Sequence, residues 1–156
     1  MTMTIRPYRT EDETACLNVF MSNTPDFFTV EEQQEFNDFL CTMTDPYFVL
    51  EEAGRIVACG GVFIRRDGQT AGLAWGMVNR SQHRQGYGRA LLDVRLAWLG
   101  QHAPAVNTVT IDTSQHSAPF FTRMGFEILE VKRDFYATGL DRYDMRLALS
   151  AVSARH

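Results

Sequence analysis

Lysine is almost missing from this chain, since only Lys132 among the fifteen basic residues is a lysine. A basic excess is missing as well, because nineteen acidic residues give the 156-residue chain a formal net charge of −4. A general nucleic-acid binder needs surplus Lys and Arg for phosphate contacts, so this class of function is excluded. The lysine shortage itself is explained most simply by genome composition.

Cysteine and long apolar runs are also scarce. The three cysteines, Cys16, Cys41 and Cys59, form an odd, widely spaced set without a CxxC pair, which argues against a disulfide framework and a zinc site. The N-terminal stretch lacks the apolar core of a signal peptide, and no apolar run approaches the roughly 20 residues that span a bilayer. We therefore expect a cytoplasmic protein without a metal site or a membrane partner.

The charge that is present is unevenly distributed. From Thr10 to Gly54 there are eleven carboxylates and no Lys, Arg or His, whereas the rest of the chain carries fifteen basic and eight acidic residues. The net charge of −4 is therefore −11 from this segment and +7 from the rest. A solvated surface explains any single carboxylate, but the segment as a whole indicates a preference for cations.

Apolar residues make up 45% of the chain, and no repeat or linker divides it. This predicts one domain over residues 1–150, with 151–156 as a flexible tail. The apolar periodicity predicts a strand, two helices, three strands, a helix, a strand, a helix and two strands, hence an α/β or α+β domain with a mixed sheet. The two early helices are predicted to begin at T-x-x-E capping boxes, Thr10–Glu13 and Thr29–Glu32.

A glycine-bearing segment between an apolar strand and an amphipathic helix carries the chemical signal. Gly86 and Gly88 let the backbone turn tightly, and the first N–H groups of the following helix have no intrahelical partner. With Arg80, Arg84 and Arg89 nearby, this arrangement predicts a phosphate-binding loop, and an ordinary glycine turn before a helix is the alternative. The P-loop pattern is absent, and the third glycine of the Rossmann pattern is missing.

Two motifs together resemble the GCN5-related N-acetyltransferase (GNAT) family. VNRSQHRQGYGRALLDVRL, residues 78–96, resembles its acetyl-CoA motif [Q/R]-x-x-G-x-[G/A], and APFFTRMGF, residues 118–126, resembles its short fourth helix with a Gly-Phe step. The order of elements also agrees, so the resemblance covers nearly the whole chain. It implies a GNAT-like mixed, mostly antiparallel sheet of six to seven strands flanked by about four helices.

The resemblance also implies which residues hold the acetyl donor, acetyl-CoA. Backbone groups of the glycine segment would bind the CoA pyrophosphate, and those at the end of the preceding strand would bond the pantetheine arm and the acetyl carbonyl. The residues implied are Met77, Val78, Arg84, Gln85, Gly86, Tyr87, Gly88 and Arg89.

Two positions depart from the family pattern. His83 stands where relatives have Gln or Arg. Phe121 stands four residues before Gly125, where many relatives have a tyrosine that protonates the departing thiolate. A phenylalanine ring has no proton to give, so another group or water must act in its place.

Few residues are available for proton transfer. The strand Thr70–Val78 contains no carboxylate, although some relatives place a catalytic Glu there. His116, just beyond Asp112 at the end of the fifth strand, titrates in the useful range, although a surface or capping role is the simpler explanation for it. Tyr136, expected in the loop before the last strand, could line the acceptor pocket or act as a substitute acid.

The predicted function is direct transfer of an acetyl group from acetyl-CoA to a primary amine of a cationic small molecule or peptide. Glu31, Glu32 and Glu35 are candidates for attracting that cation. A non-catalytic acyl-CoA sensor on the same fold is the alternative, favoured by Phe121, and a plain scaffold is a third possibility. A homodimer is left open.

Overall fold

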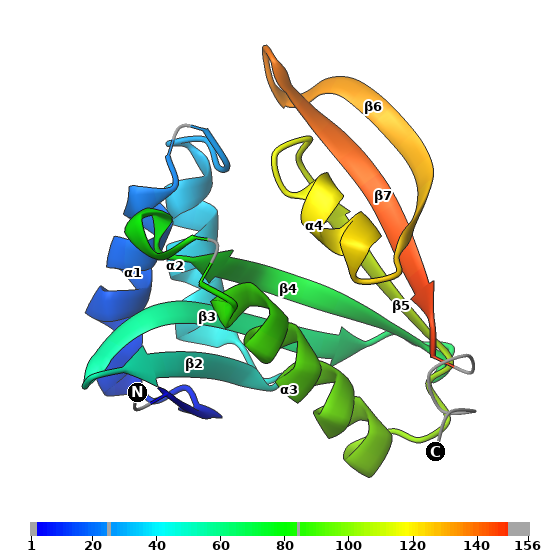
Figure 1. Cartoon of the computed structure of the whole chain (residues 1–156), viewed down its shortest axis with the longest axis horizontal. Helices are drawn as coiled ribbons and strands as arrows, with labels where there is room; N and C mark the ends of the chain where they lie inside the picture. Colours follow the sequence, from blue (N-terminus) through cyan, green and yellow to red (C-terminus); the bar gives the residue numbers. More distant parts are fainter. Residues whose placement is uncertain (1–2, 25, 84, 150–156) are drawn as a thin grey trace. The chain divides into compact units, whose positions relative to one another are not determined.

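The computed structural model describes residues 3–24, 26–83 and 85–149, and its elements follow the predicted order (Figure 1). They are β1 Met3–Pro7, the 3-10 turn η1 Thr10–Asp12, α1 Glu13–Ser22, α2 Glu32–Thr42, β2 Tyr47–Glu52, β3 Arg55–Ile64, β4 Thr70–Val78, the 3-10 turn η2 Arg80–Gln82, α3 Tyr87–His102, β5 Thr108–Thr113, α4 Ala118–Arg123, β6 Glu127–Ala137 and β7 Leu140–Ala148. The expected tail, 151–156, lies outside the described residues.

The strands form one mixed sheet in the order β1-β2-β3-β4-β5-β7-β6. β4 and β5 pair in parallel from Thr70 and Thr108, whereas β1 with β2, β2 with β3, β5 with β7 and β6 with β7 are antiparallel. The seven strands and four α-helices found in the described residues confirm the predicted fold class. No helix in the described ranges is long and apolar enough to cross a bilayer.

The chain divides into two compact units, each with buried residues of its own. The first comprises Met1–Val62 and Ala74–Ala97, and the second comprises Phe63–Leu73 and Trp98–His156. The one domain expected over residues 1–150 stays a prediction.

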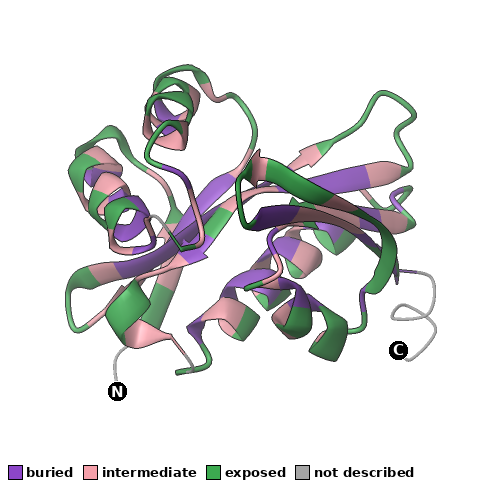
Figure 2. Cartoon of the chain, turned by 90° about the horizontal axis from the view of Figure 1, so that it is seen from above, coloured by how far each residue is buried: buried purple, intermediate pink, exposed green. Residues whose placement is uncertain are grey.

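The core of the first unit lies between α1, α2 and one face of its strands. Figure 2 shows buried residues along the strands and on the inner sides of the helices. The core residues are Cys16, Val19, Phe20, Phe36, Leu40, Tyr47, Val49, Cys59 and Met77. Each large apolar side chain that is fully buried contributes about 1.5–3 kcal/mol. α3 covers the other face, since a Cβ at Gly60, next to Cys59, would meet Leu91 of α3 at 3.0 Å.

The two predicted capping boxes have different outcomes. The Thr29–Glu32 box is confirmed, because the Thr29 N–H donates to Glu32 Oε1 at 2.9 Å and the Glu32 N–H donates to Thr29 Oγ1 at 3.2 Å. The Thr10 box is wrong: a 3-10 turn precedes α1, and Asp12 Oδ2 accepts the Arg9 N–H at 2.8 Å. Asp12 also accepts two bonds from the Arg6 guanidinium, at 2.8 and 2.9 Å, which makes it the better capping acid.

In the second unit, Tyr136 lies within β6 and not in a loop as expected. The strand continues to Ala137, which pairs with Leu140, because register shifts absorb the residues between Lys132 and Ala137. Asp134 takes a positive φ of 53° there and accepts the Gly139 N–H at 2.6 Å. The polar, turn-like sequence between Lys132 and Ala137 therefore forms an irregular end of β6.

Candidate functional site

The segment that follows β4 is shaped by its own hydrogen bonds. The Asn79 N–H donates to the Val57 carbonyl at 2.7 Å, which holds the end of β4 against β3. Asn79 Oδ1 accepts from the Ser81 N–H at 3.1 Å and from Ser81 Oγ at 2.8 Å, and the Gln82 N–H donates to the Asn79 carbonyl at 2.8 Å. Asn79 thus turns the chain out of the strand towards the glycines.

Gly86 has the backbone that the predicted phosphate loop requires. Its φ is +84°, a conformation that favours glycine, and a Cβ built there would meet nothing within 4 Å. The Gly86 carbonyl accepts the Ala90 N–H at 3.1 Å and closes the first turn of α3, so the first N–H groups of this helix need other acceptors. Open space beside such donors suits an anionic group, and the loop therefore fits a pyrophosphate.

The other predicted loop residues differ in surroundings. Gln85 and Arg89 are exposed, Gly88 is half-buried, and Arg84 lies outside the described residues. Tyr87 is buried, and this burial is the main cause that raises the pKa of its hydroxyl. The nearby Glu52 carboxylate raises the same pKa further. Tyr87 therefore anchors the start of α3 in its neutral form.

Arg80 is not one of the open charges at this loop. Its Nη1 lies 3.0 Å from Asp26 Oδ2, and its guanidinium stacks 4.9 Å from the centroid of the Phe27 ring. Its backbone N–H donates to Ser22 Oγ at 3.0 Å. Through these contacts Arg80 links the segment after α1 to the segment after β4.

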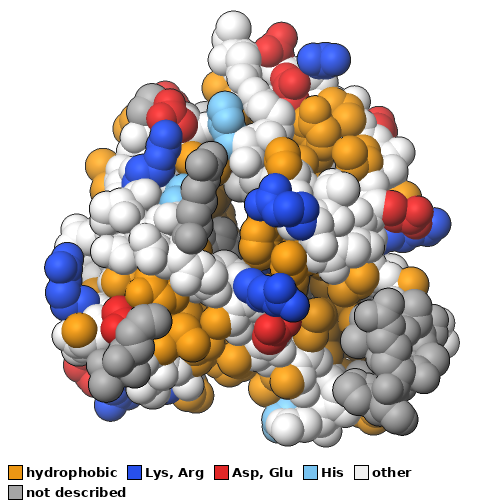
Figure 3. Space-filling model, viewed as in Figure 1, with side chains coloured by type: hydrophobic (Ala, Val, Ile, Leu, Met, Phe, Trp, Pro, Cys, Tyr) orange, Lys and Arg blue, Asp and Glu red, His pale blue; other side chains and the backbone are white. Residues whose placement is uncertain are grey.

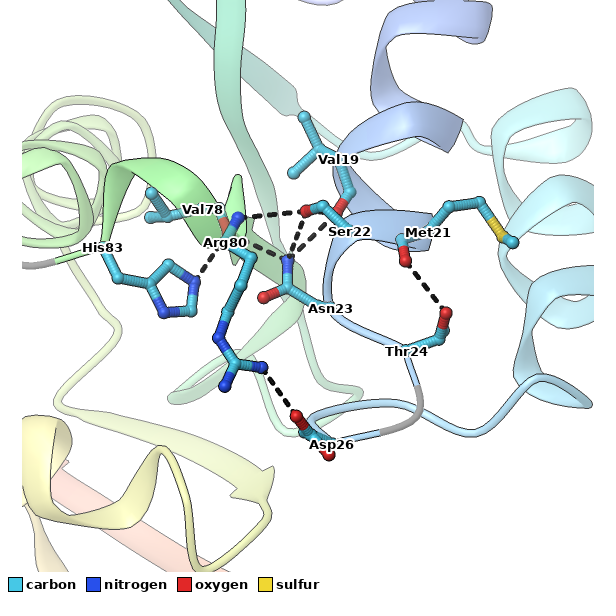
Figure 4. A network of polar contacts seen from close by, with 9 residues as sticks. All are labelled: Val19, Met21, Ser22, Asn23, Thr24, Asp26, Val78, Arg80 and His83. Atoms are coloured by element: carbon cyan, nitrogen blue, oxygen red, sulfur yellow. Dashed lines mark hydrogen bonds and ion pairs between the residues drawn. The ribbon is translucent and has the colours of Figure 1, made fainter.

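Asn23, which sequence analysis missed, holds the end of β4 (Figure 4). Its side chain is 2% exposed and donates from Nδ2 to the carbonyls of Val78, at 2.8 Å, and Val19, at 2.9 Å. His83 Nε2 lies 2.8 Å from the same Val78 carbonyl, so this nitrogen must carry the proton to donate. A carbonyl accepts about two hydrogen bonds, so Asn23 and His83 together saturate the Val78 oxygen.

Asn23 Oδ1 has no hydrogen-bond partner among the described residues, although it is buried. An asparagine directly after an amphipathic helix is typical of a helix end, and nothing in the sequence distinguishes it from an ordinary cap. Its contact with Val78 joins residues 55 positions apart, which no local pattern indicates.

β4 is distorted at Trp75, three residues before its end. Trp75 has a φ of +47°, which is unusual for a bulky residue, and its carbonyl accepts the Tyr47 hydroxyl at 2.8 Å. Its ring is 5.2 Å from that of Phe36, so the distortion is fixed by packing and by a hydrogen bond. The next residue, Gly76, is exposed.

The two catalytic candidates, His116 and Tyr136, belong to the second unit, whereas the glycine loop belongs to the first. The Tyr136 hydroxyl donates to Asp112 Oδ2 at 2.7 Å, so the structure brings Tyr136 and Asp112 together. His116 is exposed, and its backbone N–H donates to Ser114 Oγ at 3.2 Å. Phe121 is 8% exposed and packs 5.3 Å from the ring of Phe126, which makes it a core residue.

Charged side chains of both signs are interspersed on the face shown in Figure 3. Within the described part of the chain, no group of three or more His, Cys, Asp or Glu side chains could hold a metal ion.

Residues 14–126 match the model of the acetyltransferase (GNAT) family. No curated protein matches the chain in sequence. The fold is similar to that of the ribosomal-protein-S18-alanine N-acetyltransferase from Escherichia coli, with a TM-score of 0.77 and 21% identity over 94% of each chain. It is also similar to Ard1 from Thermoplasma volcanium, with a TM-score of 0.78 and 18% identity over 95% of this chain and 98% of that chain.

A third solved structure is an aminoglycoside 6′-N-acetyltransferase complexed with coenzyme A. Its TM-score is 0.76 at 10% identity, over 94% of this chain and 97% of that chain. Likeness at these identities establishes a shared fold.

Proposed function

Because the chain belongs to the GNAT family of acetyltransferases, we propose that it moves an acetyl group directly from acetyl-CoA to a primary amine. The observation that carries this proposal is the loop before α3, where Gly86 takes a φ of +84° beside open space. A neighbour of the same fold is complexed with coenzyme A, which supports CoA as the donor's carrier. The donor would contact Met77, Val78, Arg84, Gln85, Gly86, Tyr87, Gly88 and Arg89.

In this mechanism the free amine attacks the thioester carbonyl, and the acetyl group passes to nitrogen without an acyl-enzyme. Backbone N–H groups near the distorted part of β4 would hold the carbonyl oxygen as it gains negative charge. The Trp75 distortion supports this role, because it turns the backbone out of regular strand geometry at that point. Asn23 and His83 fix the Val78 peptide from its carbonyl side.

Proton transfer is needed more for the amine than for the thiolate. A thiol with a pKa of about 8.5 leaves as thiolate at pH 7 at a cost of roughly 2 kcal/mol. An alkyl amine with a pKa of about 10.4 is unprotonated in only about one molecule in a few thousand. A base or a water chain is therefore required, and we assign this task to His116, with Tyr136 as the acid that Phe121 does not supply.

The acceptor is proposed to be a cationic small molecule or a peptide, met in the cytoplasm. A homodimer is compatible with this activity and is not required by it. The decisive experiment is acetylation of a panel of amines, with release of the CoA thiol as the readout. Thiol release that depends on one class of amine supports the proposal.

A non-catalytic acyl-CoA sensor is the second candidate, and the burial of Phe121 favours it, because the usual acid is replaced by a core residue. Thermal stabilisation by acetyl-CoA separates the outcomes. Stabilisation with thiol release identifies the transferase, and stabilisation without release across the whole panel identifies the sensor. Absence of stabilisation would exclude both.

A further inference from the structure

Arg95 is a buried charge on the inner side of α3. Its side chain is 2% exposed, and its guanidinium rests against two neighbouring strands at glycines. A Cβ at Gly60 would lie 3.2 Å from Arg95 Nη1, and a Cβ at Gly76 would lie 3.1 Å from Nη1 and 3.3 Å from Nη2. The two glycines therefore make the room that the guanidinium occupies.

The guanidinium has little to balance its charge. It donates from Nε to the Leu91 carbonyl and from Nη1 to the Gly61 carbonyl, both at 3.3 Å, out of five N–H donors. None of the ion pairs among the described residues includes Arg95. Tyr47, which lies nearby, is neutral at physiological pH, because burial raises its pKa well above the usual value.

Arg95 nevertheless stays charged. Burial lowers its pKa to about 10, which is still far above neutral pH. An arginine is rarely buried without a carboxylate partner, because removing the charge from water is expensive and an apolar side chain of similar size would be more stable. A charge kept at such a cost is better explained by something it acts on than by the stability of the fold.

The position of Gly76 indicates which group the charge of Arg95 acts on. This glycine is exposed, follows the distorted Trp75, and lies directly against the guanidinium. Under the proposed function, the thioester lies along this end of β4. Negative charge develops there twice: on the carbonyl oxygen when the C–N bond forms, and on sulfur when the C–S bond breaks with its electron pair.

Resting on the proposed function, we propose that Arg95 is the counter-charge for the acetyl transfer and stabilises the CoA thiolate through the peptide of Gly76. Arg95 keeps all its protons and touches no reacting atom, so it is a positioning residue that acts by its field. The proton of the attacking amine goes to the base or to water. The field of Arg95 adds to the proton that Tyr136 is proposed to supply in place of the acid missing at Phe121.

The test compares the thiol pKa of bound CoA in the wild type, Arg95→Met and Arg95→Lys. Met keeps an unbranched apolar stem without the charge, and Lys keeps the charge. Arg66→Met, which removes an exposed arginine in the β3–β4 turn, controls for net charge. Titration follows the ultraviolet absorbance of the thiolate, and the complex with S-methyl-CoA provides the blank for the three protein cysteines.

We expect Arg95→Met to raise the bound thiol pKa by about one unit, a tenfold smaller thiolate fraction, and to lower kcat about tenfold without raising KM for acetyl-CoA. Its Tm should not fall, because an unpaired buried charge is removed. Arg95→Lys and Arg66→Met should follow the wild type. An unchanged thiol pKa in Arg95→Met overturns the inference.

The two proposals fail in different ways. If the wild type does not bind CoA in calorimetry, the proposed function fails before Arg95 is tested. If CoA binds and the thiol pKa does not respond to the charge at position 95, only the role of Arg95 fails. Should Arg95→Met not fold, Arg95→Gln provides the same neutral comparison.

Discussion

Gly86 offers the sharpest test of the donor-binding loop, because its substitution by Ala separates conformational strain from ligand binding. Gly86 has a φ of +84°, and a methyl group there would meet no atom within 4 Å. The free protein therefore loses no packing, and its only cost is the left-handed backbone, about 1–2 kcal/mol for a residue with a Cβ. The bound donor would instead meet the methyl group in the space that its pyrophosphate needs.

Gly54 is a matched control for this strain. Its φ is +79°, it also has nothing within 4 Å of a built Cβ, and it lies in the turn between β2 and β3. Part of this strain is offset, because alanine also reduces the conformational entropy of the unfolded chain. Both Ala variants should therefore lose about 1 kcal/mol of unfolding free energy. For a chain of this size that corresponds to a fall in Tm of about 2–4 °C.

Calorimetric titration with CoA distinguishes the two variants. Loss of one charge-assisted hydrogen bond from the loop to the pyrophosphate costs about 1.5–3 kcal/mol, so Gly86→Ala should bind about tenfold to a hundredfold more weakly. Gly54→Ala should bind like the wild type. Equal affinities in the two variants, at equal losses of Tm, would show that the loop before α3 does not hold the pyrophosphate.

Three further perturbations test the site and the fold. Asn23→Ala removes a donor to the Val78 carbonyl, so unfolding free energy should fall by about 1–3 kcal/mol and KM for acetyl-CoA should rise; an unchanged KM contradicts the positioning role. Tyr136→Phe should lower kcat about tenfold or more if its hydroxyl provides the proton, and unchanged turnover excludes that role. The Arg6 guanidinium holds the pKa of Asp12 below its usual range. The ionised carboxylate therefore stabilises the fold fully above the unfolded pKa of about 3.9, and this stabilisation is lost as the pH falls through the lower folded pKa. Asp12→Asn should therefore weaken the acid dependence of urea unfolding, and an identical dependence would refute this assignment.

Local patterns in the sequence were sufficient where the structure is locally determined. The strand Thr70–Val78 was predicted with its observed bounds, because it follows an Asp-Gly turn signal, and in the structure the Asp67 side chain accepts the Thr70 N–H at 2.9 Å. The Thr29–Glu32 capping box likewise involves only residues three apart. The glycine loop could be predicted because a positive φ favours glycine and the start of a helix favours particular residue types.

The features that sequence analysis missed depend on contacts between distant residues. Arg95 looks like one polar position of an amphipathic helix, and only the glycines on two strands reveal that it is buried. The backbone of Trp75 is fixed by a hydroxyl 28 positions away, on Tyr47. Tyr136 was misplaced because the irregular end of β6 has the composition of a turn.

The acidic segment also has a different meaning once its partners are known. Four of its eleven carboxylates bind cations or backbone within the first unit: Asp12, Asp26, Glu32 and Glu51. Arg6, from outside the segment, pairs with two of them, so part of the charge of −11 is neutralised by the fold. Glu31 and Glu35 are exposed at the start of α2, where the helix dipole favours acids without any ligand. Any preference for a cationic acceptor therefore depends on a few exposed carboxylates, and salt screens such charges beyond about 8 Å, so it acts at short range.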